Sequence, residues 1–308
     1  MITGCAGFIG SALAQRLLEE GFEIVGVDCF LDLSYSAETK QEAFTRLEGI
    51  KGFFAVRADI RDDLPDKAWD GVSAVVNLAA MPGLSKSWED FDVYNGCNFV
   101  AVNRLLEKAK EVGLEHFIQI STSSVYGQLA LGSENDALEP ISPYGVTKLA
   151  GERLVAAYGR SYGLAFTILR YFSVYGPGQR PDMAYHIIAE RILNRVPVTV
   201  FGDGSQSRSN TFIDDAVRAT IAALAVGPTS TTMNIAGGRE VTLLEAIEHL
   251  ERALGQQAIV RFDEPRRGDQ LHTRGDTSRA KTVLGYEPQI EPAEGLAAQA
   301  EWHMRKRS

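Results

Sequence analysis

Tyr144 and Lys148 are the two side chains whose types and spacing could most directly do acid–base chemistry. Ser142 and Pro143 stand just before them, and serine followed by proline is typical of the N-cap and first position of a helix. In that helix the phenol and the ammonium, at i and i+4, lie on one face. A neighbouring cation lowers the pKa of a tyrosine because it stabilises phenolate. The pair predicts an acid or base near neutral pH, although the same spacing also fits a surface contact.

A cluster of hydroxyl residues precedes this helix in the chain. The mostly apolar run 117–120 leads directly into Ser121, Thr122, Ser123 and Ser124. Such a run predicts a buried parallel strand, and open α/β sheets bind ligands at the carboxyl ends of these strands. We therefore expect the four hydroxyl groups to face a ligand. For Ser121, and for Ser173 further along the chain, the sequence leaves open that the hydroxyl merely caps a strand end or binds water.

Three glycines near the amino end are spaced as in a phosphate-binding loop. Gly4, Gly7 and Gly10 follow a very short predicted strand and precede an amphipathic helix. Glycines there permit a tight turn and let a pyrophosphate approach the backbone amides of the helix, although a glycine trio alone also fits an ordinary turn. The next predicted strand, 23–27, ends in Asp28. A carboxylate there would bind the ribose hydroxyls and repel a 2′-phosphate, so we expect NAD rather than NADP.

Strands and helices alternate along the first 171 residues, which predicts a Rossmann-type doubly wound parallel sheet, an α/β fold. The further expected elements are strands at 53–56, 74–80, 117–120 and 166–170 and a helix from about 94 to 112. Asp59, after the third strand, could bind the adenine amine or serve as a loop residue. The predicted cofactor-binding residues are Gly4, Gly7, Phe8, Ile9, Gly10, Asp28, Asp59, Ile60, Ala79, Asn98, Tyr144 and Lys148.

Turn-rich segments after residue 171 carry arginines. Arg180, Arg208 and the pair Arg266 and Asp269 stand in three such segments. Each alone is more often a solvated surface charge, but together, flanking one cleft, the arginines would bind a diphosphate. The expected elements here are a helix at 214–225, a strand at 233–236 and a helix opened by a capping box at 242 and ended at 255. We expect a first domain of residues 1–171, to which 211–238 return, and a smaller interleaved α/β domain of 172–210 and 239–308.

The composition is that of an ordinary globular chain. Its 308 residues are 45% hydrophobic and 23% charged, with a net charge of −9, which disfavours nucleic acid and anionic membranes as partners. No apolar run reaches membrane-spanning length, and no charged amino-terminal region precedes an apolar stretch, so we expect a cytoplasmic protein. Cys5, Cys29 and Cys97 lack metal or redox spacing. We expect them to be reduced and buried, and we predict no metal site.

Taken together, these motifs resemble the extended short-chain dehydrogenase/reductase family, and more narrowly its nucleotide-sugar epimerase, dehydratase and decarboxylase branch. The resemblance runs almost end to end, because Arg170-Tyr-Phe-Ser-Val-Tyr-Gly-Pro, Asn210-Thr-Phe-Ile-Asp-Asp and Asp276-Thr-Ser-Arg-Ala-Lys also fall in family order. Within that branch, Arg180-Pro-Asp-Met-Ala and Val27-Asp-Cys-Phe-x-Asp look most like UDP-glucuronate 4-epimerases. The resemblance implies tightly bound NAD, a UDP-sugar substrate and a homodimer.

The resemblance also implies residue roles. Tyr144 would be the catalytic base, Lys148 would lower its pKa and hold the nicotinamide ribose, and Thr122 would contact the reacting sugar oxygen. Arg208, Arg266 and Asp269 match residues that hold UDP. The predicted substrate-binding residues are Ser121, Thr122, Ser123, Ser173, Arg180, Arg208, Arg266 and Asp269. The chain departs from the family at Asn77, where histidine is frequent, at Ser209-Asn210, and at Ser173, where many relatives have threonine or asparagine.

The substrate can be narrowed from the hydroxyl cluster. Relatives that dehydrate carry acidic residues at the positions of Ser123 and Ser124, and decarboxylases carry glutamate at the second, so both activities are disfavoured. The 4-keto form of a uronate is a β-keto acid, and an epimerase must hold its carboxylate out of line with the carbonyl to avoid losing carbon dioxide. Ser121, Thr122, Ser123 and Ser173 could do so by hydrogen bonds. The remaining alternatives are a UDP-glucose or UDP-N-acetylglucosamine 4-epimerase, a UDP-glucuronate decarboxylase, and a non-catalytic NAD-binding sensor.

Overall fold

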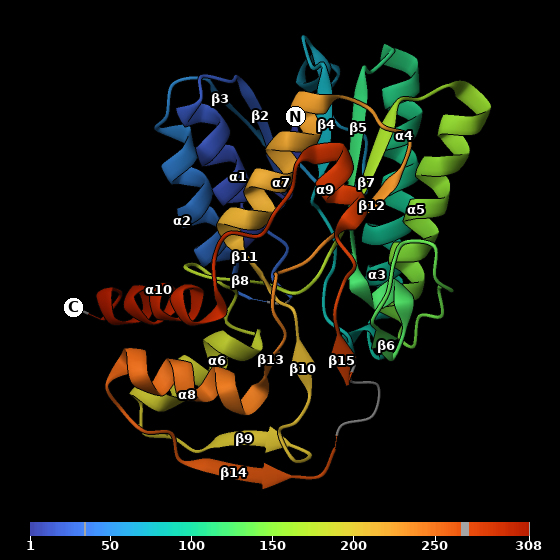
Figure 1. The fold of residues 1–308 in the computed structure, drawn as a ribbon. Helices are drawn as coiled ribbons and strands as arrows, with labels where there is room; N and C mark the ends of the chain where they lie inside the picture. Colours follow the sequence, from blue (N-terminus) through green and yellow to red (C-terminus); the bar gives the residue numbers. More distant parts are fainter. Residues whose placement is uncertain (34, 266–270, 308) are drawn as a thin grey trace.

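A seven-stranded parallel sheet forms the centre of the molecule (Figure 1). The computed structural model describes residues 1–33, 35–265 and 271–307. The strand order is β12-β7-β5-β4-β1-β2-β3, which changes direction between β1 and β4. The bounds are β1 Ile2–Thr3, β2 Ile24–Asp28, β3 Phe53–Arg57, β4 Ala74–Asn77, β5 His116–Thr122, β7 Phe166–Tyr171 and β12 Thr232–Ile235. This order confirms the predicted Rossmann-type sheet, and ligands bind such sheets at the carboxyl edge near the change of direction.

Helices cover both faces of this sheet (Figure 1). One face carries α1 Phe8–Glu19, α2 Ala37–Glu48 and α7 Ile213–Val226, and the other carries α4 Ala101–Val112 and α5 Pro143–Tyr162. Because both faces are covered, β5 and β7 are buried at every position. Side chains of these strands alternate between the two faces, and on each face they pack against helices. Only the strand ends can therefore face a ligand.

The start of α5 is set by local sequence. Ser142 accepts a hydrogen bond from the Gly145 amide at 3.1 Å, Pro143 occupies the first turn, and Gly163 ends the helix with φ +72°. These are the predicted N-cap and proline, joined by a left-handed glycine terminus. They fix where the first turn of α5 stands relative to β5, and that turn carries Tyr144.

A smaller group of elements lies beside the carboxyl edge of the sheet (Figure 1). Its helices are α6 Ala184–Leu193, α8 Leu243–Leu254 and α10 Pro292–Arg305, and β9 Val198–Phe201 pairs in parallel with β14 Val260–Asp263. Thr242 and Glu245 form the predicted capping box of α8, and Gly255 ends that helix. The remaining elements are α9 Ser278–Leu284, the 3-10 helices η1 Asp66–Trp69, η2 Ser85–Trp88 and η4 Ser123–Tyr126, and the short strands β6 Leu129–Ala130, β8 Val174–Tyr175, β10 Ser207–Arg208, β11 Thr211–Phe212, β13 Val241–Thr242 and β15 His272–Thr273.

Some expectations need correction. The helix expected from 94 begins earlier, as α3 Phe91–Asn95, and passes through a π-helical turn, η3 Gly96–Val100, before α4. Cys29 was expected to be buried but is exposed, because it follows the end of β2. Among the described residues, no helix is both long and apolar enough to cross a membrane.

Candidate active site

A continuous cleft of about 1250 Å³ runs along the carboxyl edge of the sheet, between it and the smaller group of elements. A typical pocket for one small ligand has about 300–1,000 Å³, so this cleft has room for two. The predicted site residues that line it are Gly4, Gly7, Phe8, Ile9, Gly10, Asp28, Asp59, Ile60, Ala79, Ser121, Thr122, Ser123, Tyr144, Lys148, Ser173, Arg180 and Arg208. Arg266 and Asp269 lie outside the described residues. Predicted residues up to 204 positions apart in the chain, Gly4 and Arg208, are thus brought to one surface.

Tyr144 lies in the first turn of α5 and reaches the end of β5. Its hydroxyl is hydrogen-bonded to that of Thr122. The Thr122 oxygen also accepts a hydrogen bond from the Ser124 amide at 3.1 Å, which fixes the threonine side chain. The Tyr144 ring packs edge to face against Tyr94 of α3, with ring centroids 6.3 Å apart. Helix, strand and aromatic contact together hold the phenol in one position.

Lys148 stands one turn further along α5 and is buried. Its Nζ donates a hydrogen bond to the Ile120 carbonyl oxygen at 2.6 Å. Burial lowers the pKa of Lys148 to about 8, while Glu152 opposes this. The lysine therefore faces the end of β5, inside the cleft, rather than bulk water.

The expected effect of Lys148 on the Tyr144 pKa is not found in this structure. Burial raises the pKa of Tyr144, and the forces that oppose the rise are the Thr122 hydrogen bond and the positive charge of Arg180. The prediction assumed that i and i+4 spacing brings the ammonium to the phenol. Instead the Ile120 carbonyl accepts a hydrogen bond from the ammonium, and the positive charge that lowers the Tyr144 pKa comes from the Arg180 guanidinium in another loop.

The glycine loop leaves no room for side chains. A Cβ on Gly4, whose φ is +67°, would lie 2.8 Å from the Ala79 amide nitrogen, and one on Gly10 would lie 2.2 Å from the Gly4 carbonyl oxygen. Gly7 is the N-cap of α1 and has no side chain to cap that helix. The N-terminus of α1, where backbone amides favour an anion, thus lacks a side-chain cap from Gly7, while the Phe8 amide hydrogen-bonds the Tyr35 hydroxyl. The glycines therefore let a ligand approach the backbone closely, as the binding of a pyrophosphate requires.

Asp28 ends β2 beside this loop. One carboxylate oxygen accepts from the Ala6 amide at 2.9 Å and the other from the Phe30 amide at 2.8 Å. Burial raises the pKa of Asp28, and the two amides oppose this rise. Each oxygen keeps a further lone pair, so the carboxylate can accept from the hydroxyls of a ribose.

The hydroxyl cluster includes one buried group without a partner. Ser121 is 4% exposed, and its Oγ has no hydrogen-bond partner among the described residues. A buried hydroxyl that lacks a partner is costly, so a polar ligand atom in the cleft would satisfy it. Ser173, by contrast, is exposed at the cleft surface, and its backbone carbonyl accepts from the Thr211 amide.

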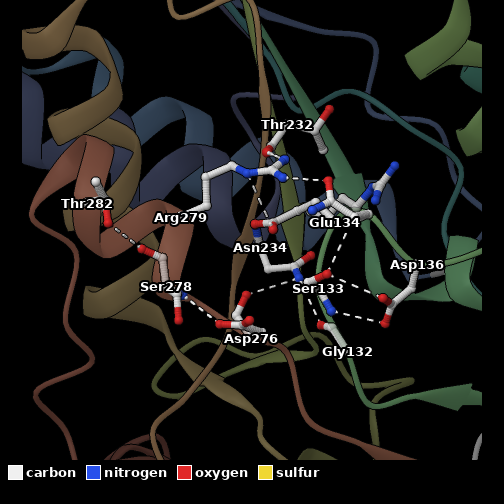
Figure 2. Close-up of polar contacts among 12 residues, drawn as sticks. Gly132, Ser133, Glu134, Asp136, Thr232, Asn234, Asp276, Ser278, Arg279 and Thr282 are labelled. Atoms are coloured by element: carbon white, nitrogen blue, oxygen red, sulfur yellow. Dashed lines mark hydrogen bonds and ion pairs between the residues drawn. The ribbon is translucent and has the colours of Figure 1, made fainter.

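A buried polar network anchors the turn that follows the cluster. Tyr126, at the end of η4, accepts from Arg170 at 2.9 Å and donates to the Asn234 side-chain oxygen at 2.7 Å. Figure 2 shows the far side of this network, where the Asn234 amide group donates to the carbonyls of Gly132 and Asp276. Through Tyr126, four residues outside η4 (Arg170, Asn234, Gly132 and Asp276) therefore fix the turn that holds Ser123 and Ser124.

Some predicted residues take other positions than expected. Asn98 is buried behind the cleft wall, where it pairs with both backbone groups of Met81 and donates to Thr147. Asp59 lines the cleft, but its carboxylate is held by the Arg61 guanidinium, with the closest atoms 2.6 Å apart. Arg180, expected at a diphosphate, is paired with Asp182, and its charge acts on Tyr144.

Sequence reasoning missed three tyrosines that line the cleft, Tyr35, Tyr171 and Tyr185. Tyr35 lies just beyond the end of β2, with the Lys40 ammonium 4.5 Å from its ring centre. Tyr185 lies in the first turn of α6, near Arg208 and Asn210. Position after a strand end was the available signal for Tyr35. Tyr185 directly follows the Arg180-Pro-Asp-Met-Ala motif that the sequence singled out.

Comparison with known proteins places this geometry in a family. The model of the NAD dependent epimerase/dehydratase family matches residues 1–236. The chain is 38% identical to an uncharacterized UDP-glucose epimerase, YtcB, of Bacillus subtilis (96% of this chain, 95% of that one). It is 36% identical to a UDP-glucuronate 4-epimerase of Thermodesulfobacterium geofontis (98% and 95%). A crystal structure of UDP-glucuronic acid 4-epimerase from Bacillus cereus with UDP-glucuronic acid and NAD is 40% identical, covers 99% of this chain and 98% of that one, and superposes with a TM-score of 0.93. This chain belongs to the NAD dependent epimerase/dehydratase family.

Proposed function

We propose that this chain is an NAD-dependent UDP-glucuronate 4-epimerase, which interconverts UDP-glucuronate and UDP-galacturonate. The observation that carries the proposal is the hydrogen-bonded pair of Tyr144 and Thr122, next to buried Lys148, in a cleft with room for two ligands. Relatives that align over nearly the whole chain bear this name. A sensor would need the glycine loop but not a hydroxyl pair poised for proton transfer.

NAD fits the residues at the glycine loop. Gly4, Gly7 and Gly10 would receive the pyrophosphate, and Asp28 would accept hydrogen bonds from the adenosine ribose. Lys148, buried inside the cleft, would contact the nicotinamide ribose at the other end of the cofactor. When bound, NAD supplies a hydride acceptor that gives the hydride back within one catalytic cycle.

The chain's own residues would move the proton. Tyr144 Oη, as phenolate, takes the proton of the sugar C4 hydroxyl and later returns it. Thr122 keeps the phenol oriented and contacts the same sugar oxygen. Arg180 is the cation that favours phenolate in this structure, because burial otherwise raises the Tyr144 pKa. The sugar must turn over between the two proton transfers so that the configuration at C4 inverts.

The hydroxyl cluster favours a uronate. Ser121, Thr122, Ser123 and Ser173 lie along the cleft and could hold the C5 carboxylate by hydrogen bonds, out of line with the C4 carbonyl. Serines at 123 and 124 leave no carboxylic acid there to remove the C5 proton. The second candidate is a 4-epimerase of UDP-glucose or UDP-N-acetylglucosamine, which the name of the Bacillus subtilis relative supports.

The smaller group of elements would bind the nucleotide. We propose that residues 172–210 and 239–308 form a UDP-sugar-binding domain, and that residues 1–171 and 211–238 form the NAD-binding domain. Arg208 lines the cleft on the side of the smaller group and would contact the diphosphate. Arg266 and Asp269, which belong to the same proposal, stand outside the described residues.

We also propose a homodimer through η3, α4 and α5. Val100 and Val146 are 41% and 50% exposed on these helices, and Phe91 of α3 is 48% exposed. Apolar side chains exposed on adjoining helices favour association with a second copy. Sedimentation analysis would show a mass of about twice 33.6 kDa if this is right.

The decisive experiment follows the products by nuclear magnetic resonance. Purified protein is incubated separately with UDP-glucuronate, UDP-glucose and UDP-N-acetylglucosamine. The proposal expects UDP-galacturonate from the first and much slower conversion of the others. Conversion of a neutral sugar alone would establish the second candidate, a pentose product would indicate a decarboxylase, and no product despite bound NAD would indicate a sensor.

A further inference from the structure

Three side chains that can bind metals meet between α6 and α10. His186 and Glu190 stand at i and i+4 on α6 and thus share a face. His303 comes from the last turns of α10. One ligating atom from each residue lies within 4.8 Å of the other two. None of the three lines the cleft, so the cluster is separate from the candidate active site.

The tautomer of His186 is fixed by its surroundings. Its Nδ1 lies 2.7 Å from the Gln179 carbonyl oxygen, and a carbonyl can only accept, so Nδ1 carries the proton. The lone pair is then on Nε2. A backbone carbonyl that orients an imidazole in this way is a frequent partner of metal-binding histidines.

His303 is buried, and one of its ring nitrogens has no hydrogen-bond partner among the described residues. The residue is 1% exposed, its Nδ1 lies 2.7 Å from a carboxylate oxygen of Glu190, and Nε2 has no partner among the described residues. The rings of His186 and His303 approach to 4.5 Å between centroids. Two imidazoles and a carboxylate therefore converge, and His303 Nε2 is left without a hydrogen bond from the described residues.

We propose that His186, Glu190 and His303 bind a divalent transition-metal cation, and that zinc suits them best. Two imidazole nitrogens and one carboxylate oxygen form a ligand set that zinc accepts, with water as a fourth ligand.

The surroundings set two conditions on binding. The Arg307 guanidinium also pairs with Glu190, and the Lys306 ammonium lies 5.3 Å from the neighbouring Trp302 ring, so two cations stand near the site. Glu190, whose carboxylate oxygens pair with His303 and Arg307, must also turn one oxygen towards the metal. We therefore expect moderate affinity, in the micromolar range of about 1–100 μM.

A bound cation would join α6 to α10 and brace the loop before α6. Gln179, whose carbonyl holds His186, also accepts through its side chain from Gln299 of α10. The next residue is Arg180. Zinc would thus stabilise the folded protein and restrict the segment that carries this arginine, without taking part in the chemistry at Tyr144.

The test is a calorimetric titration of the chelator-treated, dialysed full chain with zinc chloride, together with thermal unfolding with and without zinc. We expect one equivalent to bind, a higher Tm with zinc, and affinity at least about tenfold weaker in His186→Gln and His303→Gln. His249→Gln, the same change on α8, is the matched control and should bind as the parent does. His186 is only partly buried, so its variant remains informative if His303→Gln fails to fold.

Cobalt supplies a second readout, because its visible spectrum reports coordination directly. The proposal expects a tetrahedral or five-coordinate spectrum that the double variant loses. Zinc binding that persists unchanged in that variant would overturn it, and so would a Tm that zinc does not raise. A simple interhelical hydrogen bond would instead lower the metal-free Tm in the variants and leave zinc without effect. None of these measurements uses a UDP-sugar, so they are independent of the proposed epimerase activity.

Discussion

The ammonium nitrogen of Lys148 lies 2.6 Å from the carbonyl oxygen of Ile120, the residue that precedes the hydroxyl cluster on β5. This contact ties α5 to the strand end and keeps the lysine inside the cleft. It also means that the ammonium is bound by backbone rather than by the Tyr144 phenol. Activation of the phenol in the free protein therefore depends on Thr122 and Arg180.

We predict that Lys148→Met stabilises the protein at pH 7. The folded state lowers the lysine pKa from 10.5 to about 8, so between those values the unfolded chain binds more protons, and stability rises with pH. Below pH 8 the buried ammonium costs about 3 kcal/mol of unfolding free energy. Methionine removes this cost, but it also removes the hydrogen bond to the Ile120 carbonyl, so the net gain is smaller. Urea unfolding should give the variant a larger free energy of unfolding than the parent at pH 7, and this difference should shrink towards pH 10. A variant less stable at pH 7 would contradict this.

Tyr144→Phe should abolish epimerisation while NAD remains bound. Removing a general base costs about 10²- to 10⁴-fold in rate, and phenylalanine keeps the packing against Tyr94. Turnover is followed by nuclear magnetic resonance and bound NAD by absorbance after denaturation. Tyr162→Phe, on the same helix with 62% of the residue exposed, is the control and should retain full activity.

Gly10→Ala should release the cofactor. The new Cβ would lie 2.2 Å from the Gly4 carbonyl oxygen, so the glycine loop must shift away from the start of α1. Gly49→Ala is the matched control, because its Cβ would have no atom nearer than 3.5 Å. We expect the ratio of bound NAD to protein to fall at least about tenfold in the first variant only. Equal NAD content in both would argue against the loop as the pyrophosphate site.

His116 should make the protein less stable in mild acid. Its ring is buried, and burial lowers its pKa from 6.5 to about 4, so the unfolded chain binds the proton first. Stability is then lost as the pH falls from 6.5 to 4, by up to about 3 kcal/mol. His116→Gln should flatten this part of the stability curve measured with urea. A curve as steep as that of the parent would assign the acid sensitivity elsewhere.

Removing one partner of the buried ion pair of Arg170 and Glu152 should cost far more unfolding free energy than replacing both partners by apolar residues. Both side chains are 3% exposed, and their closest atoms are 2.7 Å apart. Arg170→Met leaves a buried carboxylate and should cost about 3–5 kcal/mol of unfolding free energy. The double change Arg170→Met with Glu152→Met should recover much of this loss. If the double variant is as unstable as the sum of the single ones, the pair is not coupled.

Much of the fold could be predicted because its signals are local. The alternation of apolar strands with amphipathic helices predicted the parallel sheet, and short motifs predicted individual ends, such as Ser142 and Pro143 at α5 and the capping box at Thr242. Hydroxyl and glycine clusters at strand ends predicted the cleft, since parallel strands bring their carboxyl ends to one edge. These inferences need only the order of residues along the chain.

What the sequence could not decide depends on contacts between distant segments. Helical spacing brings Lys148 near Tyr144, but only the packed strand end shows that the Ile120 carbonyl binds the ammonium. Asn98 was expected at the cofactor, yet its side-chain amide pairs with both backbone groups of buried Met81. His303 meets His186 and Glu190 across 113 positions or more, and no spacing rule covers such a distance. Side-chain partners are chosen by tertiary packing, and the sequence limits only which residues are available.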